Sequence, residues 1–273
     1  MESKTAAAVK LKHRPLGLWR SDEAPAGARQ YTLRTKYSPS SACSMSLIEM
    51  AFAKGVPCSF STGTVHCPGA VNGFGLARPP WPSPGGMMGN LRLVSNGNRS
   101  CEEGRAAIEE LRSMGASRGK LEQFAEGEGF KKDPETLMKS FESLPRIPPV
   151  EGFVNYAPLA DLSDPPEAVI FLADPQQLTA LTVLAGYALP HSEAVTVPFV
   201  AACGAVGALP LAESLRPVPR AVIGLADVTM RKVMRRLVGR NLVTFSAPWR
   251  LYSEMEGNIE ESFITRPDWR SIA

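Results

Sequence analysis

Residues 168–175 read Ala-Val-Ile-Phe-Leu-Ala-Asp-Pro, and this stretch decides the fold class. Six apolar residues with a β-branched and aromatic centre are typical of a buried strand. Asp174 is a favourable helix N-cap and Pro175 suits a first helical turn, so the pattern predicts a helix through Tyr187. A buried strand that leads into a capped helix is typical of an α/β protein.

Further elements are predicted on both sides of this unit. Ser44 to Lys54 carries an apolar stripe at helical spacing, which Gly55 ends, and Asp227 caps a helix through Val238. The β-rich runs are 11–19, 58–65, 153–157, 194–200, 221–225 and 242–246. We therefore predict an α/β (mixed α+β) protein, in which a mixed sheet is flanked by helices.

The middle of the chain and its C-terminal tail are predicted to contain no strands. The Pro- and Gly-rich stretch 78–88 predicts a surface loop, and two helices follow, one capped by Ser100 and one that starts at Asp133-Pro134. The tail after Glu256 is predicted to be irregular and held by Phe263 and Trp269. Our domain scheme is one domain over 1–273, divided into a half-repeat 11–77, a loop and helical connector 78–150, a second half-repeat 151–257 and a tail 258–273.

We infer the half-repeats from a short sequence motif that occurs twice. Residues 67–77 read Cys-Pro-Gly-Ala-Val-Asn-Gly-Phe-Gly-Leu-Ala, and residues 203–212 read Cys-Gly-Ala-Val-Gly-Ala-Leu-Pro-Leu-Ala. Each copy follows a β-rich run, so a strand that leads into a cysteine-headed helix is expected in both. Two pseudo-symmetric halves are predicted to place Cys67 and Cys203 in equivalent positions.

Composition limits the class of protein. The 273 residues are 44% hydrophobic and 21% charged, with a formal net charge of +3, as in ordinary soluble globular proteins. This charge is too small to indicate a nucleic-acid partner, and the N-terminus lacks the apolar core of a secretory signal. No window is apolar for long enough to span a membrane. We therefore expect a cytoplasmic protein with reduced cysteines.

Thiols are the first candidate chemistry. A cysteine at a helix start meets unpaired N–H groups that favour the thiolate, the form that binds metals. Cys43, Cys67 and Cys203 on three segments suit an iron–sulfur cluster with one open iron, or a zinc site completed by His66 or His191. The chain has no Cys-x-x-Cys pair. Burial as small apolar side chains is therefore the alternative for these cysteines.

Two metal-free interpretations remain beside the metal site. Gly69 and Gly204 would let an anionic small molecule approach a helix start, and Arg231 belongs to a basic cluster on its helix. Such a protein either binds the anionic small molecule or is a thiol-dependent enzyme without a cofactor. The apolar run from Val195 to Leu211 supports another interpretation, a homo-oligomeric scaffold. The residues leave open whether the protein is an enzyme.

The chain resembles a known family over about Leu16 to Trp269. The residues that carry the resemblance are Cys43 with Leu47 and Ala51, Gly55, Cys67-Pro-Gly-Ala with Gly73 and Gly75-Leu76, Leu144-Pro145, Ala157-Pro158-Leu159, the run 168–175, Cys203-Gly-Ala, Arg231, and Phe245-Ser-Ala-Pro248. They are similar to the domain of unknown function 169, the uncharacterised ArCR family. The resemblance implies no settled activity. It implies that Cys43, Cys67 and Cys203 are the family's cysteine positions, while Cys58 and Cys101 are structural.

Overall fold

The structure, a computed structural model, describes residues 1–30, 44–61, 74, 76, 84–145, 147–149, 152–225, 228–234 and 241–272. These residues belong to two compact units. The first unit contains the described residues up to 76 and from 147 onward, and the second contains residues 84–145. Within these ranges, no helix has the length and apolar character that a membrane crossing requires.

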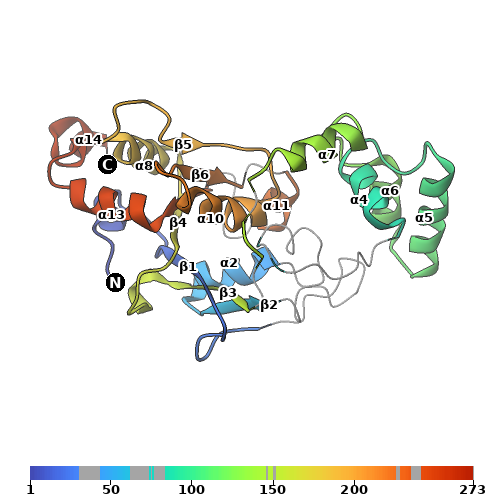
Figure 1. Cartoon of the computed structure of the whole chain (residues 1–273), viewed down its shortest axis with the longest axis horizontal. Coiled ribbons are helices and arrows are strands. Elements are labelled where there is room, and N and C mark those ends of the chain that lie inside the picture. Colours follow the sequence, from blue (N-terminus) through green and yellow to red (C-terminus); the bar gives the residue numbers. More distant parts are fainter. Residues whose placement is uncertain are drawn as a thin grey trace. The chain divides into compact units, whose positions relative to one another are not determined.

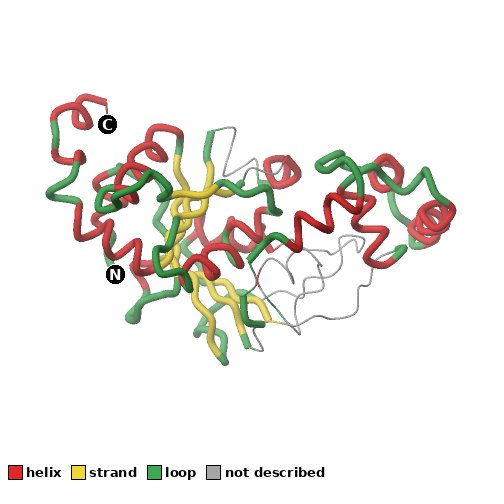
Figure 2. The backbone as a smooth tube through the Cα atoms, turned by 45° about the horizontal axis from the view of Figure 1, so that its top comes forward, coloured by secondary structure: helices red, strands yellow, loops and turns green. Residues whose placement is uncertain are grey.

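The described strands of the first unit form one seven-stranded sheet in the order β2-β3-β1-β4-β7-β6-β5 (Figures 1 and 2). All neighbouring pairs are antiparallel except β5 and β6, which are parallel. The strands are β1 (Leu16–Ser21), β2 (Cys58–Ser61), β3 (Phe153–Pro158), β4 (Ala168–Ala173), β5 (Val195–Thr196), β6 (Ala221–Gly224) and β7 (Val243–Pro248). The predicted mixed sheet is confirmed.

The apolar run Ala168–Ala173 is the central strand β4. All six of its residues are buried, because strands pair with both of its edges and helices cover its two faces. The helix that follows, α8 (Pro175–Gly186), begins with a capping box, in which Asp174 accepts from the Gln177 N–H and Gln177 accepts from the Asp174 N–H. This predicted strand and helix are both confirmed.

The two faces of the sheet have separate cores. On one face α2 (Ser44–Lys54), α9 (Ala202–Ala205) and α10 (Ala208–Ser214) cover side chains such as Leu18, Tyr156 and Ile170. On the other face α8 and α13 (Trp249–Asn258) cover side chains such as Phe171 and Phe245. Neighbouring strand residues therefore alternate between two cores, as the period of two in a strand requires.

The predicted irregular tail is wrong, because helices build most of it. After α13, a short 3₁₀ turn η2 (Phe263–Thr265) leads to α14 (Pro267–Ile272). Phe263 and Trp269 do pack together, with their ring centroids 5.8 Å apart in an edge-to-face arrangement. The N-terminal helix α1 (Lys4–Ala8) is joined to α13, since the Glu256 carboxylate accepts from the N–H groups of Lys4 and Thr5.

The second unit is helical. It contains α4 (Gly86–Val94), α5 (Glu102–Ser113), α6 (Arg118–Glu126) and α7 (Pro134–Glu142). The helix at Asp133 is confirmed, since its carboxylate accepts from the Thr136 N–H at 2.7 Å. The N-cap of α5 is Cys101, one residue later than predicted. The predicted loop 78–88 is wrong at its end, because Gly85 adopts a positive φ of 67° and a helix begins at Gly86.

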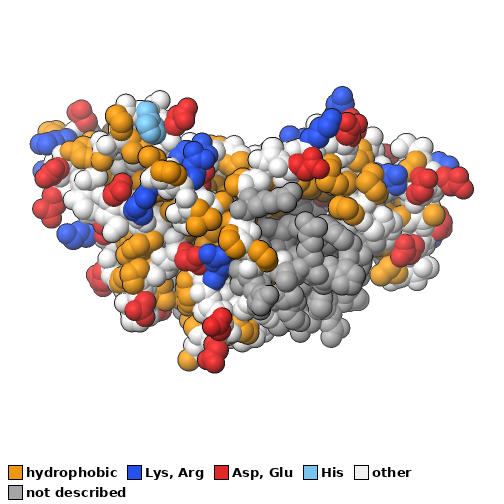
Figure 3. Space-filling model, in the orientation of Figure 1, with side chains coloured by type: hydrophobic (Ala, Val, Ile, Leu, Met, Phe, Trp, Pro, Cys, Tyr) orange, Lys and Arg blue, Asp and Glu red, His pale blue; other side chains and the backbone are white. Residues whose placement is uncertain are grey.

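Charges of both signs are interspersed on the surface. On the face drawn in Figure 3, Lys and Arg side chains lie among Asp and Glu side chains over the described parts of both units. This mixture agrees with the formal net charge of +3. Several of the charges are paired, for example Arg20 of β1 with Glu167, the residue before β4, where two guanidinium nitrogens face the carboxylate.

Candidate functional site

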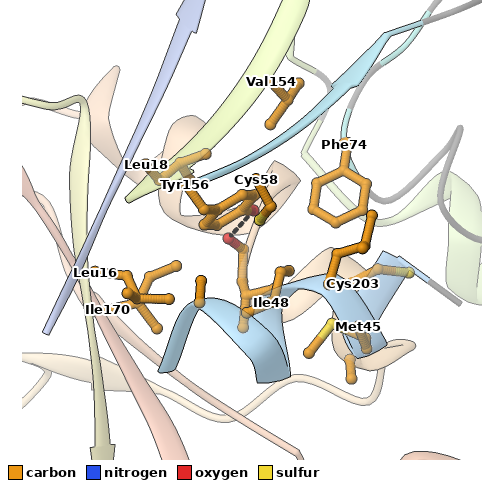
Figure 4. Close-up of a cluster of buried hydrophobic side chains, with 14 of the residues drawn as sticks. Leu16, Leu18, Met45, Ile48, Cys58, Phe74, Val154, Tyr156, Ile170 and Cys203 are labelled. Atoms are coloured by element: carbon orange, nitrogen blue, oxygen red, sulfur yellow. Dashed lines mark hydrogen bonds between the residues drawn. The ribbon is translucent and has the colours of Figure 1, made fainter. Parts of the chain in front are cut away.

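Cys203 is the second residue of the short helix α9, after the N-cap Ala201. Its side chain is only 7% exposed and belongs to the core cluster between the sheet and α2. Figure 4 shows Cys203 with Met45 and Phe74 in this cluster. The chain reaches α9 from the carboxyl end of β5, and α9 also contacts α2. The structure therefore places Cys203 where two helices meet over one face of the sheet.

A glycine in the sheet lets α9 approach closely. A Cβ built on Gly224 of β6 would lie 2.6 Å from both the Ala205 Cβ and the Thr244 Oγ1, which is shorter than real contacts. Gly204 differs, because a Cβ there would lie 3.5 Å from the Val200 side chain, an ordinary contact. The close approach at this site therefore depends on Gly224 rather than on Gly204, the glycine predicted from the sequence to let a ligand approach.

Tyr156 on β3 reaches α9 from across the sheet. Its hydroxyl donates to the Val206 carbonyl at the end of α9 at 2.8 Å, as the dashed line in Figure 4 marks. Burial raises the pKa of this hydroxyl well above its ordinary value, and the nearby thiols of Cys58 and Cys203 raise it further. Tyr156 therefore stays protonated and fixes the helix that carries Cys203.

Cys58 lies beside Tyr156 at the start of β2 and is fully enclosed. Burial raises the pKa of its thiol far above the ordinary value, because the low-dielectric core disfavours the thiolate. In the metal-free protein this thiol therefore keeps its proton and is a poor nucleophile. Cys101 caps α5 in the second unit and is partly exposed.

Arg231 lies on α11 (Val228–Val233), which follows the carboxyl end of β6. Its guanidinium is partly buried and donates to the Leu242 carbonyl at 2.5 Å, just before β7. This hydrogen bond ties α11 to the next strand. The carboxyl ends of β5 and β6, the parallel pair, thus lead to the helices that carry Cys203 and Arg231.

The other predicted site residues are placed as follows. Cys43, Cys67, Gly69 and His66 lie outside the described residues. His191 is on the exposed stretch between α8 and β5, where its Nδ1 accepts from the Glu193 N–H at 3.2 Å. Among the residues that the structure describes, no three His, Cys, Asp or Glu side chains form a group that could hold a metal ion.

Two hydroxyls of β7 are part of this region and were not selected from the sequence. Thr244 Oγ1 and Ser246 Oγ are buried and have no hydrogen-bond partner in the structure. They alternate with Phe245 and Ala247, which belong to the opposite core, so they face α9 and α10. The alternation within Val243–Pro248 shows that these residues share a face, but only the sheet order shows which helix covers them.

The effect of an unpaired buried hydroxyl on the free energy of unfolding can be measured by comparing Ser246 with Ser59, a buried serine that is hydrogen-bonded. Ser59 is equally buried, but its Oγ donates to the Asn155 Oδ1 at 2.5 Å. We expect Ser246→Ala to leave the free energy of unfolding unchanged or to raise it, because it removes an unpaired buried polar group, and Ser59→Ala to lower it by about 1–2 kcal/mol. Denaturant unfolding of both variants checks this. Equal losses would show that Ser246 is hydrogen-bonded in solution.

Comparison with known proteins adds one positive finding. The family model of the domain of unknown function 169, described as uncharacterised ArCR, matches residues 5–258. No curated protein and no solved structure matches the chain. The match includes the second unit and most of the first, with α9, α11 and every described strand of the sheet, and it ends before α14.

Proposed function

The chain belongs to the domain of unknown function 169 family, the uncharacterised ArCR proteins, and we propose that it binds a metal ion or an iron–sulfur cluster through cysteine thiolates. The proposed ligands are Cys43, Cys67 and Cys203. The proposed site lies on the face of the sheet that α2 and α9 cover.

One observation carries this proposal: described residues that follow Cys43 and Cys67 in the sequence belong to the same buried cluster as Cys203. Met45, at the start of α2, follows Cys43 by two residues, and Phe74 follows Cys67 by seven. Both side chains lie in the same cluster as Cys203 itself. Residues from segments that are remote in sequence thus pack in the same core, which supports a site with scattered ligands.

The chemistry of the donors fits a soft metal. Thiolates bind zinc and iron–sulfur clusters, and metal binding displaces the proton of each thiol, so a buried cysteine can be a ligand although burial alone keeps it protonated. Tyr156 supports such a site by holding the carbonyl end of α9. With its pKa raised well above the ordinary value, its hydroxyl keeps the proton that it donates to Val206.

Metal analysis of anaerobically purified protein tests the proposal. We expect zinc or iron in the wild-type protein and its loss in Cys43→Ser, Cys67→Ser and Cys203→Ser, because serine does not replace a thiolate toward these metals. Cys101→Ser is the matched control, since Cys101 caps a helix of the second unit, and it should keep the metal. Wild-type protein that is purified without metal, and takes up none, would reject the proposal.

A metal-free anion site is the second candidate, and the position of Arg231 favours it. The guanidinium is partly exposed on α11, after the carboxyl end of β6, and a guanidinium binds carboxylates and phosphates well. In this case Cys203 acts as a reactive thiol rather than as a metal ligand. Alkylation of Cys203 followed against pH separates the candidates, because only the second predicts fast alkylation near neutral pH in metal-free protein.

A further inference from the structure

Helix α9, which carries Cys203, is one short turn of small side chains. Its sequence, Ala202 to Ala205, is Ala-Cys-Gly-Ala, and all of these residues are buried. Small side chains have little apolar surface, so lifting this turn from the core exposes less apolar area than lifting a turn of leucines would. A helix this short also depends on its tertiary contacts rather than on its own hydrogen bonds. The contacts of α9 with the sheet therefore decide whether it stays closed.

The chain on both sides of α9 is irregular. The pairing of β5 with β6 ends at Thr196, and Val197, the next residue, is 60% exposed. After α9, Gly207 adopts a backbone conformation outside the helical region, so α9 and α10 are separate helices. Movement of α9 between these two irregular points therefore breaks no strand pairing and leaves α10 in place.

The sheet holds α9 from two strands. On β6, a Cβ built on Gly224 would lie 2.6 Å from the Ala205 Cβ, so the helix packs directly on the strand. On β3, the Tyr156 hydroxyl donates to the Val206 carbonyl at 2.8 Å (Figure 4). Burial raises the pKa of this hydroxyl well above its ordinary value, so the proton that it donates stays in place. The end of α9 is thus tied to the sheet by a polar contact as well as by packing.

The hydrogen bond from Tyr156 favours the closed position of α9 by a modest factor. While α9 is closed, the Val206 carbonyl is buried and needs a donor. When α9 lifts, water replaces Tyr156 as the partner of this carbonyl. The net effect of such an exchange on an equilibrium constant is about threefold to tenfold. A bond of this strength biases a local opening equilibrium without preventing it.

We propose that α9 opens locally and that the Tyr156 hydroxyl is the latch that sets how often Cys203 becomes accessible. The thiol is only 7% exposed when α9 is closed, so a ligand or a reagent reaches it when the turn is open. Tyr156 is thus a positioning residue, which acts on Cys203 through the Val206 carbonyl. As a route of ligand entry, the latch rests on the proposed function and deepens it. As a property of α9, it exists without any ligand.

Thiol labelling of the full-length protein tests the latch, with Cys58 as an internal control. Cys58 lies in the same core, but on β2, so it does not move with α9. A maleimide is added in the presence of a chelator, and mass spectrometry of the peptides follows each cysteine. Tyr156→Phe keeps the ring and removes the hydroxyl. We expect it to raise the labelling rate of Cys203 about threefold to tenfold, and that of Cys58 by much less.

The wild-type protein provides a second measurement. Local opening of α9 exposes little surface, so the labelling rate of Cys203 should depend on urea much less than that of Cys58 does. Equal urea dependence of the two rates would show that Cys203 is labelled only when the whole fold opens, which overturns the inference.

Ser59→Ala is the matched variant for Tyr156→Phe. It removes a buried hydrogen bond next to Cys58 and leaves α9 untouched, so it should raise the labelling rate of Cys58 and leave that of Cys203 unchanged. If Tyr156→Phe accelerates both cysteines by the same factor, the hydroxyl only stabilises the fold. If it leaves the rate at Cys203 unchanged, the hydroxyl is no latch. Either result overturns the inference.

The outcome is separable from that of the metal analysis. A protein that binds no metal, but in which Tyr156→Phe accelerates the labelling of Cys203 alone, rejects the proposed function and supports the latch. A protein that loses its metal in the cysteine variants, but in which Tyr156→Phe leaves the labelling of Cys203 unchanged, does the reverse.

Discussion

Gly104→Ala is expected to lower the free energy of unfolding of the helical unit by about 3 kcal/mol, because it forces an atom into occupied space. A Cβ on Gly104 of α5 would lie 2.0 Å from the Asn98 carbonyl oxygen. That carbonyl cannot move easily, since the Asn98 side-chain amide donates to the carbonyls of Gly89 and Phe124 and ties the helices together. Denaturant unfolding followed by hydrogen exchange in α5 measures the effect.

Gly119→Ala is the matched control in the same unit. Gly119 lies in α6, and a built Cβ meets nothing within 4 Å. Alanine there should raise the free energy of unfolding by up to about 1 kcal/mol, the difference between the two residues inside a helix. If both variants shift stability in the same direction and by similar amounts, the contact between α5 and the Asn98 backbone does not exist in solution.

Gly224→Ala is expected to have the second large effect, at the candidate site. Its Cβ would press on Ala205 and Thr244, so α9 must move away from β6, at a cost of about 1–3 kcal/mol. This shift also moves Cys203, since it is two residues from Ala205 on the same helix. We therefore expect both lower stability in denaturant unfolding and a changed rate of Cys203 alkylation.

Gly204→Ala provides the contrast for this prediction. A Cβ at Gly204 makes only an ordinary contact with Val200, and alanine is the better helix former, so stability should be unchanged or higher. An intact fold with lost ligand binding in Gly204→Ala would instead assign Gly204 the role in ligand approach that was predicted from the sequence. Equal destabilisation by both substitutions would contradict the close contact at Gly224.

Local signals in the sequence located the elements whose boundaries are set by local interactions. α2 ends where predicted, because Gly55 adopts a positive φ of 65° that ends the helix. α7 and α8 begin at aspartates whose carboxylates accept from the helix N–H groups. The strand β4 was predicted to its exact bounds, because burial on both faces makes its whole sequence apolar.

Elements that depend on distant partners were predicted less well. β5 is two residues long instead of the seven predicted, since only Val195 and Thr196 pair with β6. α6 was missed, because in its sequence, Arg-Gly-Lys-Leu-Glu-Gln-Phe-Ala-Glu, only Phe124 and Ala125 are buried and only Leu121 adds a partly buried apolar side chain. The stretch around Cys203 forms two short helices rather than one, with Gly207 between them at a backbone conformation outside the helical region.

In the candidate site, too, residues with a local signal were predicted and residues with long-range roles were missed. Cys203 was selected from its place near a helix start, which is a local property. Tyr156, Ser246 and Gly224 could not be selected, because their roles come from strand register and from the approach of α9. Tyr156 and Val206 are fifty residues apart in sequence and meet only when β3 and α9 are in place. Long-range contacts of this kind leave no periodic signal in the sequence.

Among the described residues, β2 at one edge of the sheet is followed only by an isolated parallel bridge between Arg29 and Cys58. At the other edge, the outermost strand is β5, which is two residues long. An exposed edge strand offers a row of free N–H and C=O groups, on which a second chain can add a strand and begin to aggregate. In the part of the chain that the structure describes, the outermost pairing at each edge is too short to offer such a row, and at one edge it is made by an arginine. We expect such short edge pairings to limit edge-to-edge association between copies of the protein, while the centre of the sheet is regular.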